Sequence, residues 1–242
     1  MKSELVTPVV KFVITKLPKR HLPALPFVNG ILSSGIVEQD KDKEYIEFNK
    51  TLEFTDPKSN AEYTYIPCKD GEDFEYTSII EYNSKIGRQV AIYRPNISYC
   101  KEIAPSRTFV FINELEALAA QGIIKGGRID NAIVFSHKEY PVDMLSLLAQ
   151  KFNVDLDMLS DNGILNGMTL RSPNEPARHK LLDLIGDLYL LRKPIRGKII
   201  AKRPGHTGNV AFAKFLKDMM IKKGNLKSLP FYDPKAEPLY DI

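Results

Sequence analysis

The sequence predicts an α+β fold in which an antiparallel sheet comes first and helices follow. Between Lys43 and Tyr93, apolar and polar residues alternate with a period of two, which is typical of antiparallel strands with one face in water. Between Pro173 and Leu191 the apolar residues recur instead with helical spacing. The intervening segment 106–135 alternates a strand, a helix and a strand, and therefore adds a small β-α-β unit.

Loops rich in Asp, Pro, Asn and Gly divide the period-two segment into strands. Two of these loops are 56–60 and 69–72. A short amphipathic helix is expected before the sheet, over 25–36, and a short helix after it, over 98–104. The expected strands are 45–48, 51–54, 62–67, 75–82 and 89–93.

The β-α-β unit begins with an expected strand over 106–111. Asn113 is a favourable helix cap, so a helix is expected over 114–121, ending at the following glycine. The apolar run 129–135 then predicts a second strand. The unit lacks the GxGxxG pattern of a dinucleotide-binding loop, so no dinucleotide is expected here.

The remainder of the chain is expected to be mainly helical. A helix is predicted over 142–152, and turns follow it up to residue 172. Asn174 as a cap and Pro176 in the first turn predict the start of the next helix, which runs to Leu191. The last expected elements are a strand over 197–202, a turn at 204–206, a helix over 209–222 and a linker over 224–242.

Composition argues against several classes of function. Apolar residues make up 43% and charged residues 26% of the chain, as in ordinary globular proteins. The net charge of +4 suits a small anionic ligand, but basic and acidic residues are interspersed, so nucleic acid is not an expected partner. Cys68 and Cys100 form no CxxC pair, which argues against a Cys-built zinc site and indicates a cytoplasmic location. No apolar run approaches the ~18–20 residues that span a bilayer, so at most peripheral membrane contact is expected.

The candidate functional residues gather in one predicted helix. His179 and Asp183 are four residues apart, so both side chains project from one face and can reach a single ion. Asp187 is one further turn along, and a second histidine, His206, follows within thirty residues on the Pro-Gly-His turn. The HxxxD spacing alone is weak, because a solvated surface helix or an ion pair in a metal-free ligand-binding domain produces it as well.

Four stretches together resemble one family of enzymes. They are SRTFVF at 106–111, GGRIDNAIVF at 126–135, RHKLLDLIGDL at 178–188 and a Gly-His turn at 205–206 before a helix. Their order and spacing resemble the UDP-3-O-acyl-N-acetylglucosamine deacetylases, the zinc amidases of lipid A biosynthesis, over about residues 25–223. The resemblance implies a two-layer sandwich of antiparallel sheet and helices with a β-α-β insert, which is the second domain of such a deacetylase.

The resemblance also assigns roles to single residues. His179 and Asp183 resemble two protein ligands of Zn²⁺, and Thr108 resembles the hydroxyl that helps the metal to hold the developing oxyanion. His206 resembles the general acid that protonates the leaving amine, and Asp187 resembles the carboxylate that orients it. This set suits amide hydrolysis, because Zn²⁺ activates water at neutral pH and an amine leaves only when protonated. The implied contacts with the acyl-UDP-sugar substrate are Lys180 and Arg203 near the UDP group, and Phe109, Leu115, Ile124 and Ala132 along the acyl chain.

The chain also departs from the family. Residues 1–42 match only in their last part, as the end of a first domain, so most of that domain is expected to be missing, together with the Glu-His pair that supplies the general base and a third zinc ligand. Residues 43–223 resemble the second domain, with inserts at about 111–130 and 137–172. Residues 224–242 resemble the linker to a 3-hydroxyacyl-carrier-protein dehydratase, which suggests part of a fused, bifunctional protein. Arg203 replaces a lysine of the family, which keeps the positive charge but changes its geometry.

The expected function is zinc-dependent deacetylation of UDP-3-O-(3-hydroxyacyl)-N-acetylglucosamine. The alternative is an inactive remnant that binds the acyl-UDP-sugar or a partner chain without turnover, because loss of one ligand weakens zinc binding and loss of the base slows the reaction.

Overall fold

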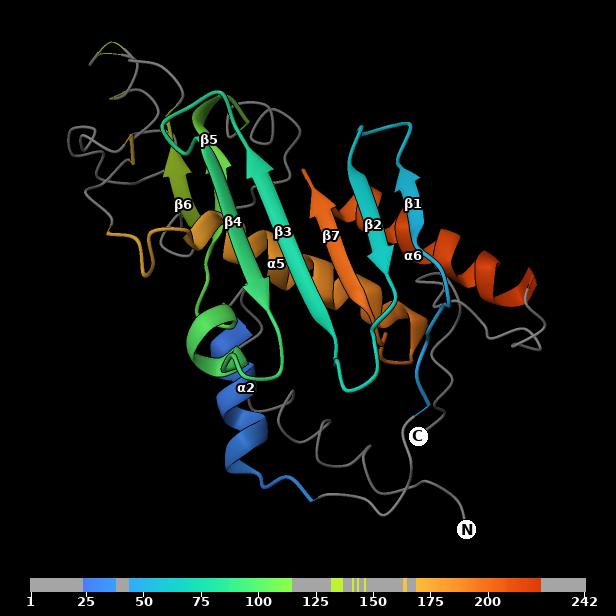
Figure 1. Ribbon diagram of the computed structural model, residues 1–242. Coiled ribbons are helices and arrows are strands. Elements are labelled where there is room, and N and C mark those ends of the chain that lie inside the picture. The colour runs from blue at the N-terminus through green and yellow to red at the C-terminus, as the bar shows by residue number, and fades with distance from the viewer. Residues whose placement is uncertain are drawn as a thin grey trace, which may run out of the picture. The chain divides into compact units, whose positions relative to one another are not determined.

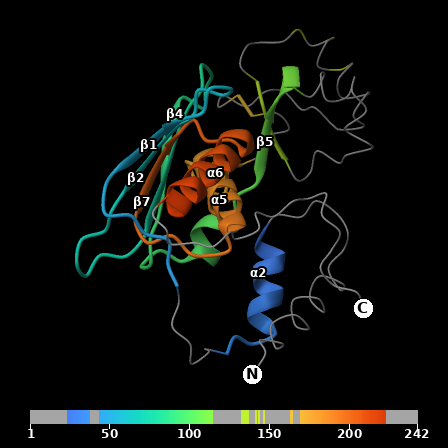
Figure 2. The ribbon, with the colours of Figure 1, turned by 90° about the vertical axis from the view of Figure 1, so that its right-hand side faces the viewer.

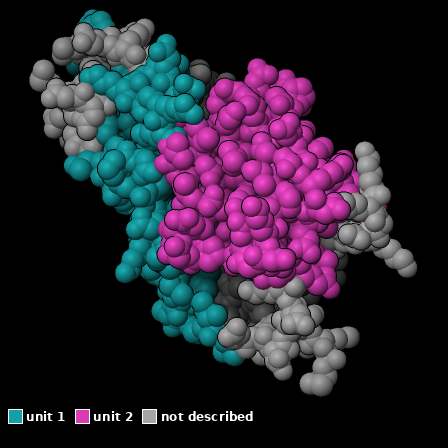
Figure 3. All heavy atoms as spheres, viewed as in Figure 1, with its two compact units in different colours: residues 1–40, 81–89, 98–179 teal, residues 41–80, 90–97, 180–242 magenta. Residues whose placement is uncertain are grey.

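The computed structural model describes residues 24–37, 44–114, 132–136, 163–164 and 169–222, with the single positions 141, 143 and 146. The chain divides into two compact units (Figure 3). Unit 1 comprises Met1–Asp40, Glu81–Gln89 and Ser98–His179, and unit 2 comprises Lys41–Ile80, Val90–Ile97 and Lys180–Ile242. The boundary between them falls within one helix, α5 (Glu175–Leu188), after His179.

Most of a five-stranded sheet belongs to unit 2, and its strand order is β1-β2-β7-β3-β4 (Figure 1). β1 pairs with β2 and β2 pairs with β7 in antiparallel orientation, whereas β7 and β3 run parallel. The fold is therefore α+β, as the sequence predicted, and the sheet is mixed but mostly antiparallel. The strands span Leu52–Thr55 (β1), Glu62–Ile66 (β2), Glu75–Glu81 (β3), Arg88–Tyr93 (β4) and Lys198–Lys202 (β7).

The parallel pair arises because β7, the last of the described strands, inserts between β2 and β3. In this central position Ile199 and Ala201 of β7 are both 0% exposed. They lie directly opposite Tyr65 and Tyr63 of β2, so the four side chains share the inner face of the sheet. A strand that is far away in the sequence thus completes the core of the earlier hairpin.

Helix α6 (His206–Lys222) lies on one face of this sheet (Figure 2). Phe212 stacks on Tyr63 with ring centroids 4.8 Å apart, and Phe215 stacks on Phe54 at 5.2 Å. Burial of large side chains of this kind contributes ~1.5–3 kcal/mol each, so these contacts attach α6 firmly to β1 and β2. The part of α5 within unit 2 adds three buried residues, Leu181, Leu184 and Leu188.

The strand expected over 45–48 was a wrong prediction, because only Ile46 forms a bridge, to Ile195. The alternation nevertheless marked the buried residues, since Ile46 and Phe48 are 1% and 4% exposed. On one side of the bridge the ladder cannot continue because Pro194 has no N–H to donate. The carbonyl of Pro194 accepts from the amide of Ile46 over 2.8 Å. On the other side the amide of Phe48 donates to the hydroxyl of Tyr65, which in turn donates to the carbonyl of Arg196.

The last helix begins at His206, three residues earlier than the predicted start at Asn209. The amide of Asn209 donates to the carbonyl of Gly205 over 2.8 Å, which is the i to i−4 bond of a helix that has already started. His206 therefore lies in the first turn of α6 and not on a free turn.

The other helices agree closely with expectation. α2 spans Ala24–Ser33, the π-helix η1 spans Tyr99–Ile103, and α5 continues as a 3₁₀ turn, η4 (Tyr189–Leu191). Of the helix expected over 142–152, only positions 143 and 146 are described, and both are helical. No helix within the described ranges has the length and apolar character needed to cross a bilayer.

Unit 1 contains a two-stranded parallel sheet of β5 (Thr108–Phe111) and β6 (Ala132–Phe135). Parallel neighbours need a crossover connection, which agrees with the expected β-α-β order. Residues 112–114 are helical, so this helix already includes Asn113, which the sequence predicted as its cap before a start at 114. The rest of the expected helix, 115–121, lies outside the described residues. Leu115, Ile124 and the expected linker over 224–242 also lie outside them.

Candidate active site

His179 lies in unit 1 on α5, and a backbone carbonyl holds its ring. Its Nδ1 atom is 3.3 Å from the carbonyl oxygen of Ser106, just before β5. Because a carbonyl only accepts hydrogen bonds, this contact requires a proton on Nδ1, and in a neutral ring the lone pair then lies on Nε2. A neutral imidazole held in one tautomer by a carbonyl is the usual state of a metal-binding histidine.

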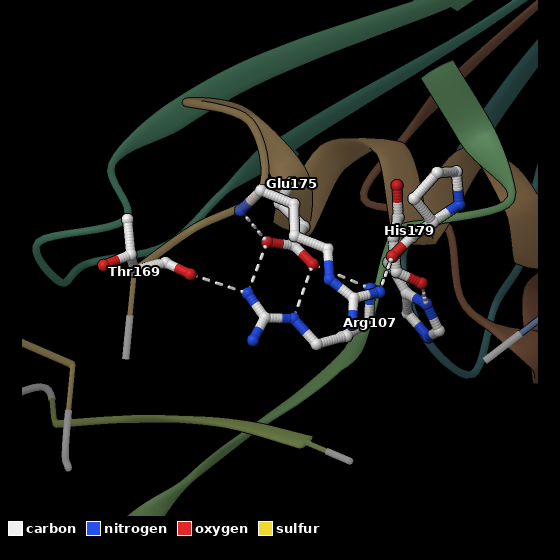
Figure 4. Close-up of polar contacts among 7 residues, drawn as sticks. Arg107, Thr169, Glu175 and His179 are labelled. Atoms are coloured by element: carbon white, nitrogen blue, oxygen red, sulfur yellow. Dashed lines mark hydrogen bonds and ion pairs between the residues drawn. The ribbon is translucent and has the colours of Figure 1, made fainter. Parts of the chain in front are cut away.

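A buried ion pair fastens the segment around Ser106 to the start of α5 (Figure 4). Arg107 donates from Nε to one carboxylate oxygen of Glu175 and from Nη2 to the other, both over 2.9 Å. Burial would raise the pKa of Glu175, but hydrogen bonds from Arg107 and from the amide of Arg171 outweigh it and hold that pKa below its ordinary value. No local pattern singles out either partner, because they are 68 residues apart in the chain.

In unit 2, the carboxylate of Asp183 lies close to two basic side chains. Its Oδ2 atom is 3.6 Å from Lys180 Nζ and 3.9 Å from His206 Nε2. The side chain of Asp183 is only 9% exposed, so water screens these charges weakly. The structure thus brings two of the sequence-predicted residues, Lys180 and His206, close to a third, the nearly buried carboxylate of Asp183.

The imidazole of His206 is bound on its other side by Asp187. His206 Nδ1 lies 2.8 Å from Asp187 Oδ2, so a protonated Nδ1 donates to the carboxylate. This hydrogen bond, opposed by partial burial and aided by the charges of Asp183 and Asp187, raises the pKa of His206 above its ordinary value. The side chain of His206 is 70% exposed, so its Nε2 proton can exchange with a ligand or with water.

Two further residues hold Asp187, and sequence reasoning missed both. Asn209 donates from Nδ2 to Asp187 Oδ2 over 2.9 Å, and the hydroxyl of Tyr63 donates to Asn209 Oδ1 over 2.8 Å. Both side chains are buried, at 0% and 1% exposure. The helical spacing of Asn209, one turn after His206, could have suggested it. Tyr63 lies 146 residues earlier than Asn209 and gave no such signal.

Gly208 leaves the space that this chain of hydrogen bonds occupies. A Cβ atom at position 208 would lie 2.6 Å from the hydroxyl oxygen of Tyr63 and 3.1 Å from the Cβ of Ala61. Both distances are shorter than ordinary van der Waals contacts, so the absence of a side chain permits the close approach of α6 to β2.

The remaining predicted residues lie at the following places. Thr108 is the exposed first residue of β5 and pairs with Ala132 of β6. Phe109 packs among aromatic rings, 5.7 Å from Tyr82 and 6.0 Å from Phe135. Arg203, at φ 54°, donates from Nη2 to the carbonyl of Asn60 over 2.9 Å and forms an ion pair with Glu62.

The donor types on α5 fit zinc, because imidazole nitrogen and carboxylate oxygen are both common zinc ligands. His179 offers Nε2, and Asp183 follows it by one helical turn. Within the part of the chain that the structure describes, no group of three or more His, Cys, Asp and Glu side chains could hold a metal ion. The two ligands that the sequence predicted are both described, His179 in unit 1 and Asp183 in unit 2.

Comparison with known proteins adds a family match over most of the chain. The family model of UDP-3-O-acyl N-acetylglycosamine deacetylase (LpxC) matches residues 11–147 and 153–218. The chain is similar to proteins named bifunctional enzyme LpxC/FabZ from Chlorobaculum tepidum (42% identity over 221 residues), Bacteroides thetaiotaomicron (39% over 222) and Porphyromonas gingivalis (37% over 220). These matches cover 89–90% of this chain and 46% of each relative, so the chain spans about half the length of the curated relatives it matches.

Proposed function

The chain belongs to the UDP-3-O-acyl N-acetylglycosamine deacetylase family, and we propose that it carries out the deacetylation step of lipid A biosynthesis on UDP-3-O-(3-hydroxyacyl)-N-acetylglucosamine. The observation that carries this proposal is the placement of His206 between two carboxylates. Asp187 binds Nδ1 at 2.8 Å, and Asp183 lies 3.9 Å from Nε2.

His206 is the proposed general acid. Its raised pKa keeps the ring protonated to higher pH than an ordinary histidine, and its exposure leaves Nε2 accessible. Cleavage of an amide requires proton delivery to the leaving amine, and a positioned histidine contributes typically ~10²–10⁴-fold to such a step. Asp187 orients the ring, and Asn209 and Tyr63 hold Asp187 in turn.

The proposed cofactor is Zn²⁺, with His179 and Asp183 as two of its protein ligands. When bound, zinc supplies a Lewis acid and lowers the pKa of water to about 7. The contact between His179 Nδ1 and the carbonyl of Ser106 keeps Nε2 available as a donor atom. The low exposure of Asp183 favours a nearby cation, because water screens its charge weakly.

The proposed substrate contacts follow from residue chemistry. Lys180 and Arg203 carry positive charge that suits the UDP group, and the hydroxyl of Thr108 suits a developing oxyanion. Phe109 and Ala132, on adjacent strands, are only partly exposed and suit the acyl chain, for which Leu115 and Ile124 are also proposed. The relatives are named bifunctional LpxC/FabZ enzymes, which supports a further proposal, that a 3-hydroxyacyl-carrier-protein dehydratase is fused to this chain or associated with it.

The experiment is acetate release from the acyl-UDP-sugar by the purified chain, with and without added Zn²⁺, together with its zinc content. We expect turnover that requires zinc and that falls ~10²–10⁴-fold in His206→Ala. Glu102→Gln, on η1, is the matched control and should retain activity. Substrate binding without turnover would support the inactive alternative, and turnover unaffected by His206→Ala would contradict the proposed mechanism.

A further inference from the structure

We propose that Arg107 and Glu175 form a positioning pair that sets the ring orientation of His179 and the place of Thr108. The inference rests on the proposed function, because it concerns a proposed zinc ligand and the proposed oxyanion hydroxyl. All of the contacts that support it lie within unit 1 (Figure 4).

The carboxylate of Glu175 accepts four hydrogen bonds. Oε1 accepts from the backbone amide and from Nε of Arg107, both over 2.9 Å. Oε2 accepts from Arg107 Nη2 over 2.9 Å and from the amide of Arg171 over 2.7 Å. A carboxylate offers about four acceptor positions, so this side chain cannot turn without breaking several bonds.

The residues on either side of this carboxylate are held as well. Arg107 Nη2 also donates to the carbonyl of Thr169 over 2.9 Å, and Arg171 Nη1 donates to the carbonyl of Pro105. Glu175 is the first residue of α5 and is 0% exposed, and the side chain of Arg107 is only 10% exposed. The pair therefore joins two loop segments and the start of the helix with little competition from water.

The same peptide group is held at both of its ends from α5. The peptide bond between Ser106 and Arg107 carries the Ser106 carbonyl and the Arg107 amide in one rigid plane. The amide donates to Glu175, and the carbonyl lies 3.3 Å from Nδ1 of His179, about one helical turn later. Any rotation of this plane that frees the amide also displaces the carbonyl that binds the histidine ring.

Thr108 follows directly on this peptide. Successive side chains of an extended chain point to opposite sides, so the side chain of Thr108 points away from that of Arg107. Thr108 is exposed while Arg107 is buried, as this alternation requires. The anchor at Arg107 thereby also sets the side of the strand on which the Thr108 side chain lies.

A neighbouring ion pair provides a matched control. Arg178, which precedes His179 on α5, pairs with Glu102 of η1, and the Glu102 side chain is 45% exposed. Glu102→Gln removes an ion pair from the same helix without touching the peptide between Ser106 and Arg107. A purely general effect of ion pairs on α5 would appear in this variant too.

The test is the tautomer of His179, measured by ¹⁵N–¹H correlation of the histidine rings in the zinc-free chain at a pH where they are neutral. The chain has four histidines, so His179→Gln identifies the signal. We expect the Nδ1–H form in the unmodified chain and a shift toward the Nε2–H form in Glu175→Gln. The glutamine NH₂ group is itself a donor, so it cannot accept the hydrogen bonds that one oxygen of Glu175 accepts. Glu102→Gln should leave the tautomer unchanged, and an unchanged tautomer in folded Glu175→Gln overturns the inference.

Circular dichroism shows whether Glu175→Gln is folded. If Glu175→Gln is unfolded, Arg107→Lys takes its place, because this variant keeps a cation beside Glu175 and loses the bidentate hydrogen bonding. A wild-type tautomer in this variant also overturns the inference. Titration with Zn²⁺ alone gives a second readout, in which we expect folded Glu175→Gln to bind ~10–100-fold more weakly than Glu102→Gln.

The two proposals fail in different ways. If Glu175→Gln changes the tautomer but the unmodified chain neither binds zinc nor releases acetate, the proposed function is wrong and the positioning role stands. If the unmodified chain deacetylates its substrate and the tautomer does not respond to Glu175→Gln, only the positioning role is wrong.

Discussion

Glu175 and Asp187 stand near opposite ends of α5, and each binds a basic side chain through its carboxylate. The partner of Glu175 is Arg107, whose side chain is 10% exposed. The partner of Asp187 is His206, whose side chain is 70% exposed. Glu175 accepts four hydrogen bonds from protein groups, whereas Asp187 holds a ring whose other nitrogen remains accessible to water.

The difference in exposure determines what each ion pair can contribute. A buried arginine never releases its proton, so the pair of Arg107 and Glu175 serves to fix geometry. A histidine titrates near neutral pH, and exposure allows its proton to leave and return. The buried pair of Arg107 and Glu175 thus fixes the backbone at the start of α5. The pair of Asp187 and the exposed His206 instead holds an exchangeable proton near the end of the helix.

The largest effect that this comparison predicts is on stability. Glu175→Ala leaves the guanidinium of Arg107 buried without its carboxylate, and loss of one partner of a buried pair costs about 3–5 kcal/mol. Urea unfolding followed by circular dichroism measures the loss. Glu102→Ala, which breaks a partly exposed pair, should cost ~0–1 kcal/mol. Equal losses in the two variants would show that burial does not distinguish the pairs.

A smaller loss of stability is expected when the hydrogen-bonded residues that hold Asp187 are changed. Gly208→Ala places a Cβ 2.6 Å from the hydroxyl of Tyr63, and overpacking of this kind costs ~1–3 kcal/mol. Tyr63→Phe leaves Asn209 Oδ1 without that donor and costs about 1–3 kcal/mol. Because phenylalanine lacks the oxygen that the new Cβ meets, the double variant should lose less than the sum of the single losses. Strictly additive unfolding free energies would contradict this packing.

The pair of Asp187 and His206 is tested by titration of the histidine. Asp187→Asn removes the hydrogen bond that raises the pKa of His206, so this pKa should fall. Histidine ring shifts followed by NMR in the zinc-free chain measure it. Glu175→Gln should leave the pKa of His206 unchanged, and a pKa that is unaltered by Asp187→Asn would contradict the assignment.

The smallest expected effect is the pH dependence of stability. The pKa of His206 is raised in the folded chain above the ordinary 6.5, so the ion pair stabilises the fold fully below about pH 6.5 and loses that contribution as the pH rises through the raised value. The unfolding free energy of wild type relative to His206→Gln should therefore be greater near pH 6 than near pH 9. Exposure of the ring keeps this difference small. A difference that grows with pH would have the wrong sign.

Much of the fold was predictable from local pattern. The alternation in β2 and β3 and the helical spacing in α5 gave their positions closely, because period and burial are linked within each element. Two predicted bounds were wrong. The segment that contains Pro194 pairs with Ile46 through a single bridge only, and α6 begins at His206, earlier than the turn residues suggested, because the amide of Asn209 already donates to the carbonyl of Gly205.

The sequence by itself predicted the α+β class and the family, because period and motif order can be read along the chain. It also singled out His179, Asp183 and Asp187 by their helical spacing, and His206 by the Gly-His turn that follows, as the residues of the proposed chemistry. Only the tertiary structure decided that β7 enters the centre of the sheet, that Tyr63 and Asn209 support Asp187, and that Arg107 and Glu175 clasp the peptide beside His179. These contacts join residues 22 to 146 positions apart in the chain, and no local pattern records which distant groups will meet when the core closes.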